Sequence, residues 1–163
     1  GYTVYFGDTG ANVYALDAAT GRELWRRQVD AHPFARITGT PSLEGTRLFV
    51  PVSSLEETAA SQPGYACCSF RGNVTALDTR TGDVLWRAFT VPPAEVVGRN
   101  AAGTDLLAPS GVAIWSTPTI DRRRGLVYVT TGNTYSGTVA APTTDAVLAL
   151  NPATGAIVWS KQL

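Results

Sequence analysis

The chain has 163 residues, of which 13 are basic and 13 acidic, so that its formal net charge is zero. The arginine clusters at 26–27 and 122–124 lie beside predicted turns, which is typical of solvated loops and gives no support to nucleic-acid binding. The sequence has no recognisable targeting segment and no apolar run long enough to span a membrane.

One motif occurs three times along the chain. It has the form Ala-Leu-(Asp/Asn)-x-x-Thr-Gly-x-x-x-Trp and covers residues 15–25, 76–86 and 149–159. Each copy predicts a strand, a turn at the Thr-Gly pair, where the chain needs a residue that tolerates positive φ, and a second strand that ends at the Trp. We therefore expect an array of similar β modules.

A second, weaker repeat precedes the later two copies. The Thr-Pro pairs at 40–41 and 117–118 lead into apolar strands at 47–50 and 126–129, which makes four strands in each module. Four-stranded modules that each end in Trp indicate an all-β fold, a β-propeller of antiparallel blades. We interpret the three repeat tryptophans as packing residues between blades.

The length of the chain limits the number of blades. A closed propeller needs at least about four blades, whereas 163 residues with two long insertions hold only about three. We therefore expect an incomplete propeller, with the end of one blade at 1–30, a second blade at 31–90 and a third at 91–163.

The two insertions contain most of the unusual residues. The repeat tryptophans are 61 and 73 positions apart, more than the roughly 40 to 50 residues of a simple blade. Loops at one end of a rigid scaffold are where binding residues concentrate. The segments concerned are Ser53–Glu57, Cys67–Cys68, Pro109–Trp115 and Thr131–Asn133.

Glu56 and Glu57 follow the predicted strand at 49–52, and Asn133 follows the equivalent strand of the next module. In a propeller, equivalent strand ends converge on one end of the axis. Carboxylate and amide oxygens suit Ca²⁺, and the single His32 cannot provide an imidazole cluster. The alternative interpretation is a solvated pair of glutamates and an ordinary turn asparagine.

Cys67 and Cys68 are the only cysteines and are adjacent, which excludes a Cys-x-x-Cys metal cage. One interpretation is a disulfide between neighbours, which implies an oxidising compartment. The other is two free thiols in a strand, one buried and one exposed.

Trp115 lies outside the repeat, before the second Thr-Pro strand and after Pro109 and Gly111. A loop there would present the indole on one end of the propeller, where it could stack on a flat ligand. The alternative is a plug that fills the axial channel.

With these motifs the chain resembles the pyrroloquinoline quinone (PQQ)-dependent alcohol dehydrogenases, and most closely their polyvinyl-alcohol dehydrogenase-like branch. The resemblance covers nearly the whole chain. Each repeat motif alone does not distinguish this family from other propellers, but the combination of motifs does. It consists of residues 32–33, 37–41, 50–57, 67–72, 115–118 and 129–133.

The resemblance implies an eight-bladed propeller and a role for each candidate residue. Trp115 would stack on the quinone, and Thr38 and Ser54 would form hydrogen bonds to its polar edge. Asn133 and Glu57 would bind Ca²⁺, with the neighbouring Glu56 as the other candidate ligand.

The cysteine pair departs from the methanol dehydrogenase pattern. In those enzymes an adjacent-Cys disulfide stacks on the quinone, but it lies several blades before the Trp. Here Cys67 and Cys68 fall in the same blade as the two glutamates. The resemblance therefore implies a disulfide near the cofactor site, with Cys67 and Cys68 among the candidate cofactor-binding residues and their stacking on the quinone left open.

The implied activity is oxidation of an alcohol to a carbonyl compound in the periplasm, with electrons passed to a cytochrome c. The family's catalytic Asp would lie in the blade beyond Leu163, so that no catalytic residue is expected in this chain. The alternatives are a non-catalytic propeller that acts as an assembly scaffold, and a structural propeller in which Ca²⁺ or the cysteine pair only stiffens loops.

Overall fold

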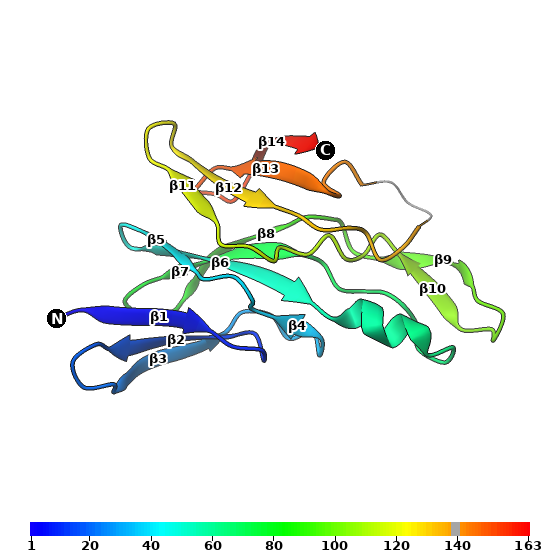
Figure 1. The fold of residues 1–163 in the computed structure, drawn as a ribbon, viewed down its shortest axis with the longest axis horizontal. Coiled ribbons are helices and arrows are strands. Elements are labelled where there is room, and N and C mark those ends of the chain that lie inside the picture. Colours follow the sequence, from blue (N-terminus) through cyan, green and yellow to red (C-terminus); the bar gives the residue numbers. More distant parts are fainter. Residues whose placement is uncertain (138–140) are drawn as a thin grey trace.

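The structure is a computed structural model that describes residues 1–137 and 141–163. The described chain forms three larger antiparallel sheets, which lie side by side in the order of the sequence (Figure 1), and one two-stranded sheet. The first sheet has three strands, in the order β1 (Thr3–Gly7), β2 (Asn12–Asp17) and β3 (Glu23–Gln28).

The second sheet has five strands and lies in the middle. Its main order is β4 (Ala35–Arg36), β6 (Arg47–Ser54), β7 (Asn73–Asp78) and β8 (Val84–Phe89), and β5 (Ser42–Glu44) also pairs with β6. The third sheet has the predicted four-stranded order, namely β11 (Thr119–Asp121), β12 (Leu126–Thr130), β13 (Ala146–Leu150) and β14 (Ile157–Gln162).

The insertions form two further elements. The 3₁₀ helix η1 (Glu56–Ser61) follows β6, and the hairpin of β9 (Glu95–Arg99) and β10 (Asp105–Ala108) precedes the third sheet. Both lie beyond the same end of the sheets in Figure 1. No helix in the described residues is long and apolar enough to cross a membrane.

Hydrogen bonds explain the repeat motif at each turn. The Asp17 carboxylate accepts bonds from the backbone amides of Ala19 and Thr20 and from the Thr20 hydroxyl, at 2.9 to 3.0 Å. Asp78 and Asn151 accept the same two backbone bonds in their own copies. The following glycines have φ of 71°, 72° and 74°, as predicted for a residue that tolerates positive φ.

The prediction that the second strand of each copy ends at the Trp was wrong. β3, β8 and β14 continue to Gln28, Phe89 and Gln162. The reason is that the preceding strand begins earlier than the motif does, so that residues as early as Asn12 still pair with Gln28.

The repeat tryptophans connect each sheet to the next one. The Trp25 indole donates to the backbone carbonyl of Thr79 at 3.0 Å, and the Trp86 indole donates to that of Pro152 at 3.1 Å. Each ring covers the turn glycine of the following copy. A Cβ on Gly82 would lie 2.7 Å from the ring of Trp25, and one on Gly155 would lie 2.5 Å from the ring of Trp86.

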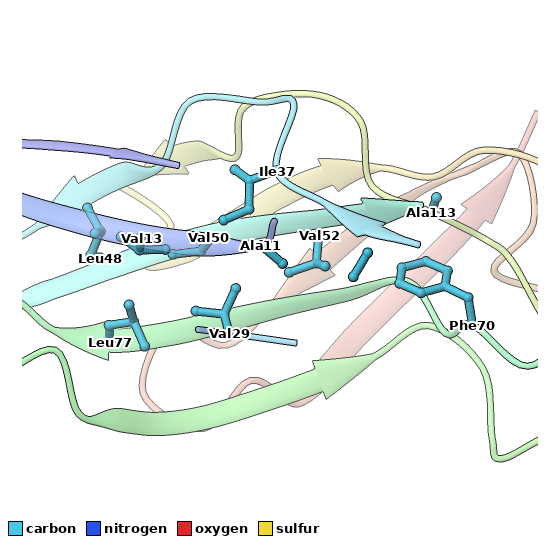
Figure 2. Close-up of a cluster of buried hydrophobic side chains, with 11 residues drawn as sticks. Ala11, Val13, Val29, Ile37, Leu48, Val50, Val52, Phe70, Leu77 and Ala113 are labelled. Carbon is cyan, nitrogen blue, oxygen red and sulfur yellow. The ribbon is translucent and has the colours of Figure 1, made fainter. Parts of the chain in front are cut away.

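The core lies between the sheets, and β6 is buried on both faces. Alternate residues of a strand point to opposite faces, so that Leu48, Val50 and Val52 pack toward the first sheet, whereas Phe49 packs toward the third. Figure 2 shows the cluster between the first two sheets, and its labelled side chains are Ala11, Val13, Val29, Ile37, Leu48, Val50, Val52, Phe70, Leu77 and Ala113.

The contact between the Trp25 ring and Gly82, in the turn of the next copy, gives a test of this packing. We expect Gly82→Ala to lower the free energy of unfolding by about 1–2 kcal/mol for the left-handed backbone, and by roughly 1–3 kcal/mol more because the new methyl meets the Trp25 ring. Urea denaturation measures the difference.

Gly125→Ala is the control, because Gly125 also has positive φ, 66°, but a Cβ there meets nothing within 4 Å. Equal losses of stability in the two variants would contradict the docking of Trp25 on this turn.

Candidate functional site

The ends of β6 and β12 lie at the same end of neighbouring sheets (Figure 1). Ser54 is the last residue of β6, and its backbone carbonyl accepts a hydrogen bond of 3.0 Å from the hydroxyl of Tyr135, which follows β12. The two strand exits expected to converge are therefore connected directly.

Thr38 and Trp115 lie at this end of the sheets and contact each other. The Thr38 hydroxyl donates to the backbone carbonyl of Trp115 at 3.1 Å and lies 3.2 Å from the Ser53 hydroxyl. Gly132 donates its amide to Ala113, and a Cβ on this glycine would lie 3.1 Å from the indole nitrogen of Trp115. The indole is thus held against the backbone after β12 and remains 37% exposed.

Glu57 and Asn133 are both exposed, and Asn133 precedes Tyr135 by two residues. Burial, followed by the nearby charge of Glu57, raises the pKa of Tyr135. The backbone carbonyl of Asn133 accepts a bond of 2.9 Å from Val112. Its side-chain nitrogen donates to Thr134 at 3.0 Å, and among residues 1–137 and 141–163 no donor contacts its side-chain oxygen. This arrangement leaves one carboxylate and one amide oxygen available to a ligand.

Ser54 belongs to the same end but is fully buried. Its hydroxyl accepts a bond of 3.0 Å from the amide of Glu56. The side chain therefore shapes the turn from β6 into η1, the helix that carries Glu57.

Glu56 points away from this group, although it adjoins Glu57 in the sequence. Its buried carboxylate accepts bonds from the amides of Ser69 and Phe70 and from the Tyr65 hydroxyl, at 2.7 to 3.1 Å. Burial alone would raise the pKa of Glu56, but hydrogen bonds from His32, Ser69 and Phe70 outweigh it and lower the pKa to about 2.

His32 completes the contacts of Glu56. Its Nε2 lies 3.4 Å from the Glu56 carboxylate and 3.2 Å from the Ser69 hydroxyl, and its Nδ1 accepts the amide of Phe34 at 3.3 Å. Because Nδ1 acts as an acceptor, the ring proton belongs on Nε2. His32 is therefore a donor to Glu56 and not a base for Ser69.

Cys67 and Cys68 form a disulfide, the first of the two interpretations of the sequence. The two cysteines directly precede Ser69 and Phe70, whose amides donate to Glu56. Their backbone also forms hydrogen bonds with the β9–β10 hairpin. The Leu107 amide donates to the carbonyl of Cys67 at 2.7 Å, and the Cys68 amide donates to that of Leu107 at 3.4 Å. The disulfide loop is thus held by two contacts, one with the Glu56 carboxylate and the other with the backbone of β10.

The structure therefore forms two groups from the predicted site residues. Thr38, Ser54, Glu57, Trp115 and Asn133 lie near the exits of β6 and β12, whereas Glu56 and the cysteine pair form a neighbouring group with His32. In the described parts of the chain, His, Cys, Asp and Glu do not gather in any group of three or more that could hold a metal ion alone.

Sequence reasoning did not find Tyr135, Tyr65 or Ser69. Tyr135 links Ser54 to the segment after β12, and the other two bind Glu56. Ser69 lies within the segment 67–72 that contributes to the family resemblance, but Tyr65 and Tyr135 belong to no repeat or quoted motif, and the sequence carried no signal for them.

Residues 37–163 match the family described as "Glucose/ethanol/alcohol dehydrogenase, beta-propeller domain". The chain belongs to this alcohol dehydrogenase propeller family. Residues 1–60 also match the family of the outer membrane protein assembly factor BamB. The expected all-β propeller fold and the expected family are thereby confirmed.

Two relatives of this family member are polyvinylalcohol dehydrogenases. The one from Pseudomonas sp is 41% identical over 163 residues, which cover 99% of this chain and 25% of the relative. The one from Sphingopyxis sp. (strain 113P3) is 40% identical over 161 residues, which cover 98% of this chain and 24% of the relative. The chain therefore spans about a quarter of the length of these relatives.

The fold is also similar to a solved structure, the quinohemoprotein alcohol dehydrogenase from Comamonas testosteroni. The TM-score is 0.71 at 26% identity, over 98% of this chain and 26% of the other.

The buried carboxylate of Glu56 gives a test of the disulfide loop. We expect Glu56→Gln to lower the free energy of unfolding by about 2–4 kcal/mol, because several donors lose a charged acceptor and stay buried. Thermal and urea unfolding at neutral pH measure the change.

Glu95→Gln is the matched control, because Glu95 is exposed on β9. A Glu56→Gln variant as stable as the Glu95→Gln variant would show that the loop does not depend on this carboxylate.

Proposed function

We propose that this chain contributes the PQQ- and Ca²⁺-binding part of an alcohol dehydrogenase. The observation that carries the proposal is that Glu57, Asn133 and Trp115, from separate segments, lie at connected strand exits. Their chemistry fits the cofactors, since a carboxylate and a free amide oxygen suit Ca²⁺ and an exposed indole offers a flat surface for an aromatic ring system.

Each residue of this group has a distinct role in the proposal. Glu57 and Asn133 hold Ca²⁺, and Glu57 is preferred to Glu56 because the oxygens of Glu56 already accept bonds from Ser69, Phe70 and Tyr65. Trp115 stacks on the quinone.

Thr38 and Ser54 act at the edge of this site. The Thr38 hydroxyl holds the backbone of Trp115, and it would form a hydrogen bond to the polar edge of the quinone. Ser54 is buried and acts through the turn that presents Glu57.

The reaction is the oxidation of an alcohol to a carbonyl compound. When bound, PQQ would supply a hydride acceptor and Ca²⁺ a Lewis acid, with Trp115 holding the quinone and Glu57 and Asn133 holding the ion. The residues of this chain bind and orient these groups, and a carboxylate base beyond Leu163 takes the hydroxyl proton.

The relatives named above include polyvinylalcohol dehydrogenases and a quinohemoprotein alcohol dehydrogenase. On this basis we propose that the substrate is a primary or secondary alcohol, with polyvinyl alcohol as one candidate, and that a cytochrome c accepts the electrons. The disulfide is typical of an oxidising compartment and supports a periplasmic location. We also propose eight blades for the whole propeller, with boundaries in this chain near residues 30 and 90.

A scaffold propeller that binds partner proteins is the second candidate, and the match of residues 1–60 to BamB favours it. Such a propeller would not need Ca²⁺ ligands and an indole at one end of the axis. The two candidates therefore differ in cofactor binding.

Cofactor binding by the full-length gene product separates them. We expect PQQ to bind in the presence of Ca²⁺ and to support alcohol-dependent dye reduction. Glu57→Gln and Asn133→Ala should each weaken PQQ binding by tenfold or more and shift the Ca²⁺ requirement to higher concentration, because the first replaces a charged carboxylate by a neutral amide and the second removes an oxygen ligand. Trp115→Ala should weaken PQQ binding at unchanged Ca²⁺ requirement.

Glu95→Gln serves again as control and should bind PQQ as the unmodified protein does. A well-folded protein that binds no PQQ with Ca²⁺ would refute the dehydrogenase proposal and favour the scaffold.

A further inference from the structure

A cavity of about 230 Å³ lies beside the candidate site, between η1, the disulfide loop and the β9–β10 hairpin. Its apolar walls are formed by Ala60, Cys67, Val97, Leu106 and Leu107. At about 30 Å³ for each water molecule, the space corresponds to roughly eight waters. It is large enough for several methylene groups.

The polar side chains of the lining already have partners within the protein. The Asn100 side chain donates to the carbonyl of Pro63 and accepts the amides of Ala102 and Thr104, all near 2.9 to 3.0 Å. The Tyr65 hydroxyl donates to Glu56, and the Ser136 hydroxyl lies 3.3 Å from that of Thr134. A sugar or a charged ligand would find few unpaired groups here, whereas an alkyl chain needs none.

The walls of the cavity are tied together. Leu107 and Cys67 share a backbone bond of 2.7 Å, and the Thr104 hydroxyl donates to the carbonyl of Pro63 at 2.7 Å. The hairpin is therefore fixed to the loop between η1 and the disulfide, and the space is part of the fold. Preformed apolar spaces with few polar groups are the usual form of small-molecule sites.

Tyr135 belongs to both the cavity and the candidate site. Its ring lines the cavity, its hydroxyl donates to Ser54, and the charge of Glu57 lies close to it. A molecule in the cavity thus lies next to the end of the sheets where Glu57 is exposed.

We propose that this cavity binds the aliphatic segment of the alcohol substrate while the hydroxyl-bearing carbon reaches the end of the sheets near Glu57. The identification of the ligand as the substrate rests on the proposed function. The site would select for chain length, because each methylene group moved from water into apolar surroundings gains about fourfold in affinity.

Alcohol binding to the full-length gene product without PQQ tests the cavity alone. Titration with ethanol, 1-butanol and 1-hexanol, followed by saturation-transfer NMR, should give affinities that rise about fourfold for each added methylene. Leu106→Trp should fill the space and lower the affinity for 1-hexanol by tenfold or more. Leu106 is 38% exposed, so that the variant can fold.

Val97→Trp is the second variant and fills the cavity from the other strand of the hairpin. Leu85→Trp is the control, because Leu85 is exposed on β8 and does not line the cavity. The control should bind 1-hexanol as the unmodified protein does. Affinities that do not depend on chain length, or 1-hexanol affinity unchanged in both cavity variants, would overturn the proposal.

The same variants with PQQ and Ca²⁺ connect the cavity to turnover. Leu106→Trp should raise KM for 1-hexanol by a larger factor than KM for ethanol, because 1-hexanol has four more methylene groups to place in the cavity. Unchanged KM for both alcohols would overturn the link to the substrate. Chain-length-dependent binding in a protein that binds no PQQ would refute the proposed function instead, and with it the assignment of the alkyl chain to a substrate.

Discussion

The arrangement of the sheets depends on the repeat tryptophan, which couples each sheet to the turn of the next one. The indoles of Trp25 and Trp86 donate to carbonyls in the following copy, and their rings cover its glycine. This contact fixes the separation and rotation of neighbouring sheets. The exits of β6 and β12 consequently meet at one end, where the hydroxyl of Tyr135 reaches Ser54.

The repeats were sufficient to predict the architecture but not its insertions. The Thr-Gly turns follow from the turn chemistry of Asp17, Asp78 and Asn151, and the four strands of the third sheet follow from the Thr-Pro repeat that precedes the motif. The ends of β3, β8 and β14 were missed because pairing with the preceding strand continues past the motif. The helix η1 and the β9–β10 hairpin have no repeat or clear period, and the position of the hairpin is set by contacts with Pro63 and Cys67 that are distant in sequence.

The candidate site was likewise predicted only in part from the sequence. Equivalent strand exits placed Glu57 and Asn133 at one end, and the family resemblance singled out Trp115, Thr38 and Ser54. Sequence could not separate Glu56 from Glu57, since two adjacent glutamates differ only in the direction that each side chain takes. The turn after Ser54 directs Glu56 into the protein, toward the amides of Ser69 and Phe70, and leaves Glu57 in solvent.

The forward direction of the tryptophan contacts has a consequence for synthesis on the ribosome. Gly82, which the ring of Trp25 covers, comes 57 residues after that tryptophan. At a synthesis rate of about 5–20 residues per second, Gly82 is added roughly 3 to 11 s after Trp25. Each new sheet thus emerges with an uncovered indole and is completed by the one that follows, so that growth of the nascent chain sets the order of assembly from the amino terminus onward.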